Sequence, residues 1–91
     1  MVYKIKFTEQ AAIKDTKKIP KEEIKSIRDD IYKLLTFDPY AYSKPLKGKF
    51  KGLRRLRVGA YRVVFTIFEK EVLISRILCR QETYKVLARS L

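Results

Sequence analysis

The sequence predicts an α+β domain in which an N-terminal strand and a two-helix hairpin pack on a mostly antiparallel sheet of about four strands. Two observations support this prediction. Residues 53–80 read as three consecutive strands rich in β-branched and aromatic residues. Residues 9–39 instead repeat their apolar residues at helical spacing. The length of 91 residues fits a single domain, 1–91, with one modest core.

The first 19 residues predict a strand followed by a helix. Val2–Phe7 alternates polar and apolar residues, so we expect three residues of this strand to face inward: Tyr3, Ile5 and Phe7. Thr8 is the expected N-cap of a helix from Glu9 to about Lys18. The expected apolar stripe of this helix consists of four residues: Ala12, Ile13, Thr16 and Ile19.

The second predicted helix has the clearest pattern in the chain. Pro20 closes the first helix and also suits the first turn of the next one, where a missing N–H has no consequence. Five residues recur at helical spacing and form its apolar stripe: Ile24, Ile27, Ile31, Leu34 and Leu35. Asp38-Pro39 ends the helix. The two helices should therefore form an antiparallel hairpin that covers one face of the sheet.

The second half of the chain predicts a loop, three strands and a short C-terminal helix. Residues 40–52 contain two glycines, a proline and four lysines, which is typical of a loop, with Leu46 and Phe50 as possible anchors to the core. Strands are expected at residues 53–58, 61–68 and 72–79, with a tight turn or bulge at Gly59-Ala60 and a hairpin turn at Glu69-Lys70. Residues 81–91 follow either as a short helix or as a mobile terminal segment.

Positive charge is concentrated in the second half of the chain. The whole sequence carries a formal charge of +12. Residues 1–40 contain nine Lys/Arg and seven Asp/Glu, whereas residues 41–91 contain thirteen and three. From Pro39 to Phe68 there is no acidic residue. A polyanion is therefore the expected partner, and the arginines inside apolar strands need a reason to be there.

Several kinds of site are excluded by composition. The chain has no histidine and a single cysteine, Cys79, so the usual zinc sites, histidine-dependent nucleophilic triads and internal disulfides are ruled out. We expect neither a metal nor a cofactor. The sequence shows no secretory signal and no apolar run long enough to span a membrane, which favours a cytoplasmic location without membrane contact.

Three stretches together resemble the RelE/ParE superfamily of bacterial and archaeal toxins. They are Lys44-Pro45-Leu46-Lys47-Gly48, then the segment from Leu53 to Phe65 (LRRLRVGAYRVVF), and Cys79-Arg80-Gln81-Glu82-Thr83-Tyr84. The resemblance covers nearly the whole chain and is closest to the RelE-like branch. It implies a microbial-ribonuclease-like α+β fold, consistent with the elements predicted above.

The resemblance also implies an activity, which is ribosome-dependent cleavage of messenger RNA in the decoding site. The implied catalytic residues are Arg55, Arg62, Arg80 and Tyr84. The implied or expected RNA-binding residues are Arg54, Arg57, Arg76, Lys47, Lys49 and Lys51. Many members have histidine where this chain has Cys79. The implied partners are the ribosome, mRNA and an acidic RelB-like antitoxin, with which the toxin would form a hetero-oligomer.

Two other functions stay open at this point. One is the gyrase-inhibiting branch of the same superfamily, whose members generally lack the closing arginine and tyrosine found here as Arg80 and Tyr84. The other is a non-catalytic RNA- or DNA-binding module, because binding and cleavage require the same arginines.

Overall fold

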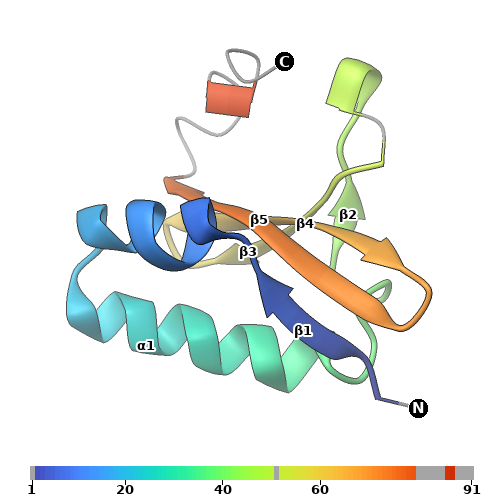
Figure 1. Cartoon of the computed structure of the whole chain (residues 1–91), viewed down its shortest axis with the longest axis horizontal. Coiled ribbons are helices and arrows are strands. Elements are labelled where there is room, and N and C mark those ends of the chain that lie inside the picture. Colours follow the sequence, from blue (N-terminus) through green and yellow to red (C-terminus); the bar gives the residue numbers. More distant parts are fainter. Residues whose placement is uncertain (1, 51, 80–85, 88–91) are drawn as a thin grey trace.

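The computed structural model describes residues 2–50, 52–79 and 86–87, apart from the side chain of Lys49. These residues form one five-stranded sheet with helices against one of its faces (Figure 1). The strands are β1 (Lys4–Phe7), β2 (Lys44–Pro45), β3 (Arg54–Val58), β4 (Tyr61–Phe68) and β5 (Glu71–Cys79). The predicted α+β class is confirmed. No helix in this described part of the chain is long and apolar enough to cross a membrane.

The strand order is β1-β5-β4-β3-β2, and the sheet is mixed. Strands β2 to β5 pair antiparallel, whereas β1 runs parallel to β5. The prediction of a mostly antiparallel sheet is confirmed, but the sheet has five strands, one more than the predicted number of about four. Strand β2 lies inside the segment predicted as a loop. The sequence did not reveal it, because a strand of two residues is too short to show an alternation of polar and apolar residues. Pro45 fits there because an edge strand does not need every N–H.

The two predicted hairpin turns are confirmed. Gly59-Ala60 joins β3 to β4, with Gly59 at φ 58°, and Glu69-Lys70 joins β4 to β5, with Glu69 at φ 55°. The sequence did not indicate a bulge in β5. Val64 pairs with Arg76 while Phe65 pairs with Ile74, so the register shifts by one residue between them. This bulge places Arg76 on the same side as Val64, away from the face on which Ile74 and Phe65 are buried.

The helical hairpin joined at Pro20 is also present. Its first arm comprises η1 (Gln10–Asp15), wound as a π-helix, and the 3₁₀ turn η2 (Thr16–Lys18). Its second arm comprises α1 (Lys21–Asp30) and η3 (Ile31–Leu35). Thr8 caps the first arm as predicted, because its Oγ1 accepts a hydrogen bond from the N–H of Ala11 at 3.2 Å.

The predicted apolar stripe of the first arm was partly wrong. Ala12 and Ile13 are exposed, whereas Ala11 and the charged Asp15 are buried and Ile19 is buried as predicted. The π-helical winding shifts the buried side away from the positions that a regular helical period predicts. Asp15 is buried because it has polar partners on β5, which a local sequence pattern cannot reveal.

The second arm buries the predicted stripe. Ile27, Ile31 and Leu35 are at most 2% exposed, and Ile24 and Leu34 are half-buried against them. They pack on the sheet residues that face the helices: Leu56, Val58, Val63, Phe65, Val72, Ile74 and Ile77. At the start of α1, Glu23 accepts a hydrogen bond from Tyr61, and this bond raises the pKa of the Tyr61 phenol above its ordinary value.

The opposite face of the sheet carries a smaller apolar cluster. Leu46 and Phe50, the latter in the 3₁₀ turn η4 (Gly48–Phe50), are buried there and anchor the loop as predicted. They pack with Val64 and Leu78 of the sheet and with Leu87. Val86 and Leu87 are helical. The rest of the predicted C-terminal helix lies outside the described residues.

Candidate functional site

The hairpin of β3 and β4 brings three of the predicted arginines to one face of the sheet. Arg57 and Arg62 are directly opposite each other in the antiparallel register. Arg55 lies two residues before Arg57 on β3 and therefore faces the same way. Like charges directly opposite on a sheet are destabilising. The fold nevertheless holds two guanidinium groups in this position.

These arginines line a cleft of about 370 Å³. The cleft is bounded by the end of the turn before β2 and by the two strands, through Ala41, Tyr42, Ser43, Lys44, Arg55, Leu56, Arg57 and Arg62. Among the described residues that line it, four are cationic and none is acidic. A concave surface with this charge attracts anions and concentrates them at its floor.

Arg62 is partly enclosed by its surroundings. It lies on β4, which has a hydrogen-bonded neighbour on both sides, β3 and β5. Its side chain is half-buried and its Nε atom is buried. A guanidinium held on a central strand meets an anion with less reorganisation than one on a mobile loop.

Arg54 does not join the cleft, because it points to the opposite side of β3. Its Nε donates to Ser43 Oγ at 2.7 Å, and its terminal nitrogen donates to the carbonyl oxygens of Ser43 at 3.1 Å and Tyr40 at 3.3 Å. The guanidinium carbon also lies 5.1 Å from the centre of the Tyr40 ring. These contacts give Arg54 a structural role, so we set it apart from the RNA-binding residues considered below.

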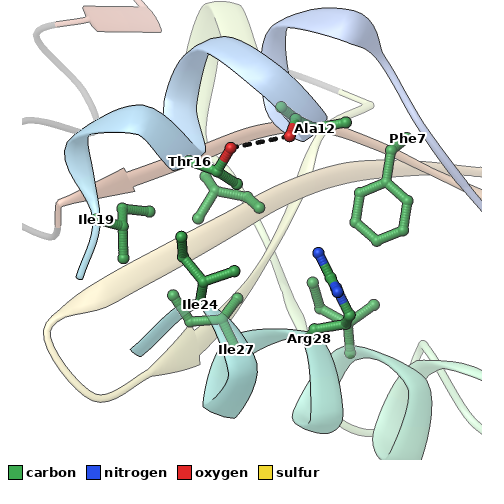
Figure 2. A pocket seen from close by; sticks show the side chains of 10 residues that line it. Phe7, Ala12, Thr16, Ile19, Ile24, Ile27 and Arg28 are labelled. Carbon is green, nitrogen blue, oxygen red and sulfur yellow. Dashed lines mark hydrogen bonds between the residues drawn. The ribbon is translucent and has the colours of Figure 1, made fainter. Parts of the chain in front are cut away.

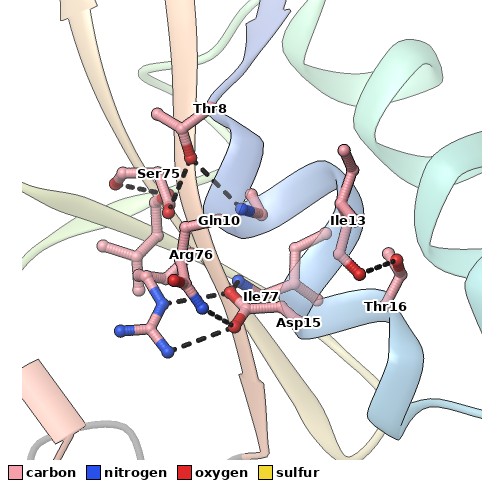
Figure 3. A network of polar contacts seen from close by, with 10 residues as sticks. Thr8, Gln10, Ile13, Asp15, Thr16, Ser75, Arg76 and Ile77 are labelled. Carbon is pink, nitrogen blue, oxygen red and sulfur yellow. Dashed lines mark hydrogen bonds and ion pairs between the residues drawn. The ribbon is translucent and has the colours of Figure 1, made fainter.

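Arg76 likewise has a structural partner. Its Nε and terminal nitrogen donate to the two oxygens of Asp15 at 3.0 and 3.1 Å. Figure 3 shows that the same carboxylate accepts the N–H of Ile77 at 2.8 Å and the amide of Gln10 at 2.9 Å. Strand β1 pairs only with residues 71–74 of β5. Beyond these residues η1 lies along the edge of β5, where Asp15 accepts the N–H of Ile77. Asp15 therefore has two roles. Its carboxylate accepts a backbone N–H at the edge of β5, and it neutralises the charge of Arg76.

The remaining predicted site residues are only partly described. Lys47 is exposed, in the segment between β2 and η4. Lys51, Arg80 and Tyr84 and the side chain of Lys49 lie outside the described residues. Two lining residues, Tyr42 and Lys44, were not predicted as site residues. Lys44 was part of a recognised motif, whereas Tyr42 gave no signal beyond being an aromatic residue in a basic loop.

A second cavity, between the helical arms, offers little chemistry. It measures about 80 Å³ and is lined mainly by apolar side chains from η1, α1 and β5. Figure 2 shows its two polar side chains, Thr16 and Arg28. The Thr16 hydroxyl already donates to the carbonyl of Ala12 at 2.8 Å. The described residues also contain no group of three or more His, Cys, Asp or Glu that would hold a metal ion.

Comparison with known proteins identifies the family. The family model of the ParE toxin of the type II toxin–antitoxin system parDE matches residues 5–84. This chain belongs to that toxin family. The predicted membership of the RelE/ParE superfamily is therefore confirmed, and the protein is the toxin component of a toxin–antitoxin system. A search of curated proteins found no match.

Solved structures of this superfamily share the fold of the toxin. The toxin–antitoxin complex RelBE2 from Mycobacterium tuberculosis has a chain that is 27% identical, with a TM-score of 0.81 over 88% of this chain and 93% of that one. The RelE–RelB complex from Pyrococcus horikoshii has one that is 25% identical, with a TM-score of 0.68 over 88% and 97%. YafQ from Escherichia coli, at 17% identity and a TM-score of 0.63 over 90% and 98%, shares the fold alone.

Proposed function

We propose that this toxin is a ribosome-dependent endoribonuclease that cleaves mRNA in the decoding site and so inhibits translation. The observation that carries the proposal is the cleft in which Arg55, Arg57 and Arg62 converge with no acidic residue among its described lining. The similarity to the RelE chain supports the same proposal.

Cleavage of RNA by its own 2′-hydroxyl places three demands on such a site. The hydroxyl must be deprotonated, the additional charge of the pentacovalent phosphate must be stabilised, and the 5′-oxygen must be protonated as it leaves. Arginine meets the second demand because its planar fork binds phosphate oxygens bidentately. In our proposal Arg62 and Arg55 stabilise the scissile phosphate, while Arg57 holds the adjoining backbone.

Proton transfer needs other residues, because the chain has no histidine. We assign the closing roles to Arg80 and Tyr84, which follow β5 in the sequence and lie outside the described residues. A tyrosine begins near pKa 10, and neighbouring arginines favour its phenolate form. Such a proton carrier is slow by itself. Positioning of the message by the ribosome would supply the missing rate enhancement, which explains the proposed dependence on the ribosome.

The same charge makes an acidic, RelB-like antitoxin the expected partner, in a toxin–antitoxin hetero-oligomer. Two of the similar structures are complexes named for RelB and RelE together, which supports this expectation. A cationic cleft is best neutralised by a segment rich in Asp and Glu that becomes ordered on binding.

One observation favours a second candidate, inhibition of gyrase without nuclease activity. The matching family model is named for ParE rather than RelE. On this reading the cationic cleft would hold a protein or DNA surface. DNA supercoiling by gyrase, assayed with and without the toxin, separates the two functions directly. A non-catalytic nucleic-acid-binding module would affect neither reaction.

The proposed function is tested by single-turnover cleavage of mRNA on programmed ribosomes with saturating toxin. We expect a 5′ product that ends in a 2′,3′-cyclic phosphate or its hydrolysed form. A message with one 2′-deoxy sugar at the cut position should still bind but should not be cut, because the nucleophile is missing. Cleavage through the deoxy linkage would contradict the mechanism. Absence of any ribosome-dependent cutting, together with loss of supercoiling, would favour the gyrase reading instead.

A further inference from the structure

Tyr42 is an exposed aromatic residue on the wall of the arginine cleft. Its side chain is 53% exposed, and it lines the cleft together with Arg57 and Arg62. An aromatic ring beside a cationic floor matches the two faces of single-stranded RNA, which carries phosphates on one side and unstacked bases on the other.

The turn that carries Tyr42 is held by its own hydrogen bonds. The backbone N–H of Tyr42 donates to the carbonyl of Asp38 at 3.4 Å, and the N–H of Ala41 donates to the Asp38 carboxylate at 3.1 Å. The Ser43 hydroxyl donates to the carbonyl of Pro39 at 2.5 Å and is buried. A ring on a fixed turn loses little conformational freedom when it binds a ligand.

Arg54 ties this turn to the sheet from the opposite face. Its guanidinium donates to Ser43 at two atoms and to the carbonyl of Tyr40. Tyr40 and Tyr42 are equally exposed, but their rings have different contacts. The ring of Tyr40 is covered by the Arg54 guanidinium at 5.1 Å. Among the described residues no ring or cation contact covers Tyr42, which is exposed and lines the cleft.

We propose that Tyr42 stacks on an unpaired RNA base next to the phosphate held by the cleft arginines, and that Arg54 is a positioning residue that holds the turn for this purpose. The inference rests on RNA being the ligand of the proposed function. Stacking of one base on an aromatic side chain contributes about 5- to 150-fold in affinity.

The test uses a single-stranded oligonucleotide with 2′-fluoro sugars, which cannot be cut by 2′-hydroxyl attack, and with 2-aminopurine at one position. Stacking quenches the fluorescence of 2-aminopurine. We expect wild type to bind with quenching at one position along the strand. Tyr42→Ala should lose the quenching and bind about 5- to 150-fold more weakly, whereas Tyr42→Phe should keep both. Phe68→Ala is the matched control, because Phe68 is exposed and does not line the cleft.

A double-mutant cycle tests the role of Arg54. Arg54→Lys keeps the charge but cannot reproduce three directed hydrogen bonds, so binding should weaken by part of the Tyr42→Ala effect. In a Tyr42→Ala background the same change should have almost no further effect, because Arg54 acts through the ring. A direct contact of Arg54 with the RNA would instead weaken binding equally in both backgrounds. Circular dichroism of each variant verifies the fold.

The outcomes separate this inference from the proposed function. If wild type cleaves mRNA on the ribosome, and Tyr42→Ala leaves cleavage, affinity and quenching unchanged, the stacking inference is wrong and the nuclease proposal stands. If wild type quenches the oligonucleotide through Tyr42 but cuts no message, stacking stands and the nuclease proposal is wrong. Quenching that survives in Tyr42→Ala but not in another aromatic variant would also overturn the inference.

Discussion

Arginines on neighbouring strands of this sheet have opposite surroundings. Arg76 on β5 meets the carboxylate of Asp15, which is 5% exposed and accepts four hydrogen bonds. Arg57 and Arg62, on β3 and β4, face each other and line a cleft without an acidic residue among its described lining. The first arrangement pairs opposite charges, and the second places like charges side by side. The surroundings of an arginine, rather than its presence in a strand, therefore indicate whether it serves stability or binding.

The energetics of the two places differ for the same reason. A buried carboxylate is tolerated only when donors replace the water that it has lost. Asp15 receives these donors from Gln10, Arg76 and the backbone of Ile77. Two like charges in register repel each other, and this repulsion by itself weakens the fold. A bound polyanion would turn this repulsion into attraction, so the protein should be more stable against unfolding when the cleft is occupied.

The largest expected effect concerns the stability of the paired arginine. Asp15→Asn should lower the free energy of unfolding by about 3–5 kcal/mol, because it leaves Arg76 partly buried without its counter-charge. Equilibrium urea denaturation measures this loss. Glu9→Gln, at an exposed acid of the same helical arm, is the control and should change stability by less than about 0.5 kcal/mol. A loss for Asp15→Asn as small as the control would mean that the pair is not structurally important.

The next effect concerns chemistry in the cleft. Arg62→Ala should lower the single-turnover cleavage rate on ribosomes by about 100- to 1,000-fold, because the phosphorane charge loses a preorganised donor. Arg62→Lys should recover only part of the rate, since an ammonium cannot reproduce the bidentate fork. Arg28→Ala removes one exposed charge from α1, on the helix-covered side, and should cut at the wild-type rate. Equal rates for wild type and Arg62→Ala at saturation would assign Arg62 to binding alone.

The smallest effect separates loop charge from strand charge. Lys47 is exposed between β2 and η4, so we expect it to contribute diffuse attraction rather than a directed contact. Lys47→Ala should weaken ribosome or RNA binding modestly and reduce the slope of log affinity against log salt by about one unit. The cleavage rate at saturation should be unchanged. A rate defect at saturation would place Lys47 with Arg62 instead.

Much of the fold follows from local patterns in the sequence. Alternation along residues 53–58 separates Arg55 and Arg57 from Arg54, and the short Gly59-Ala60 turn leads into a second strand that carries Arg62. The helical stripe from Ile24 to Leu35 likewise indicates which side is buried. Such features depend on residues close in the chain, so periodicity and turn chemistry suffice to predict them.

Other features were decided only by tertiary structure. Asp15 and Arg76 are 61 residues apart, and a bulge in β5 sets the side on which Arg76 lies. The register of β3 with β4 makes Arg57 face Arg62, and the pairing of β2 brings Tyr42 and Lys44 to the cleft. The sequence by itself determined which side chains of β3 share a face. Which charges lie beside an opposite charge and which lie beside like charges depends on long-range register and packing, because charges interact through space rather than along the chain.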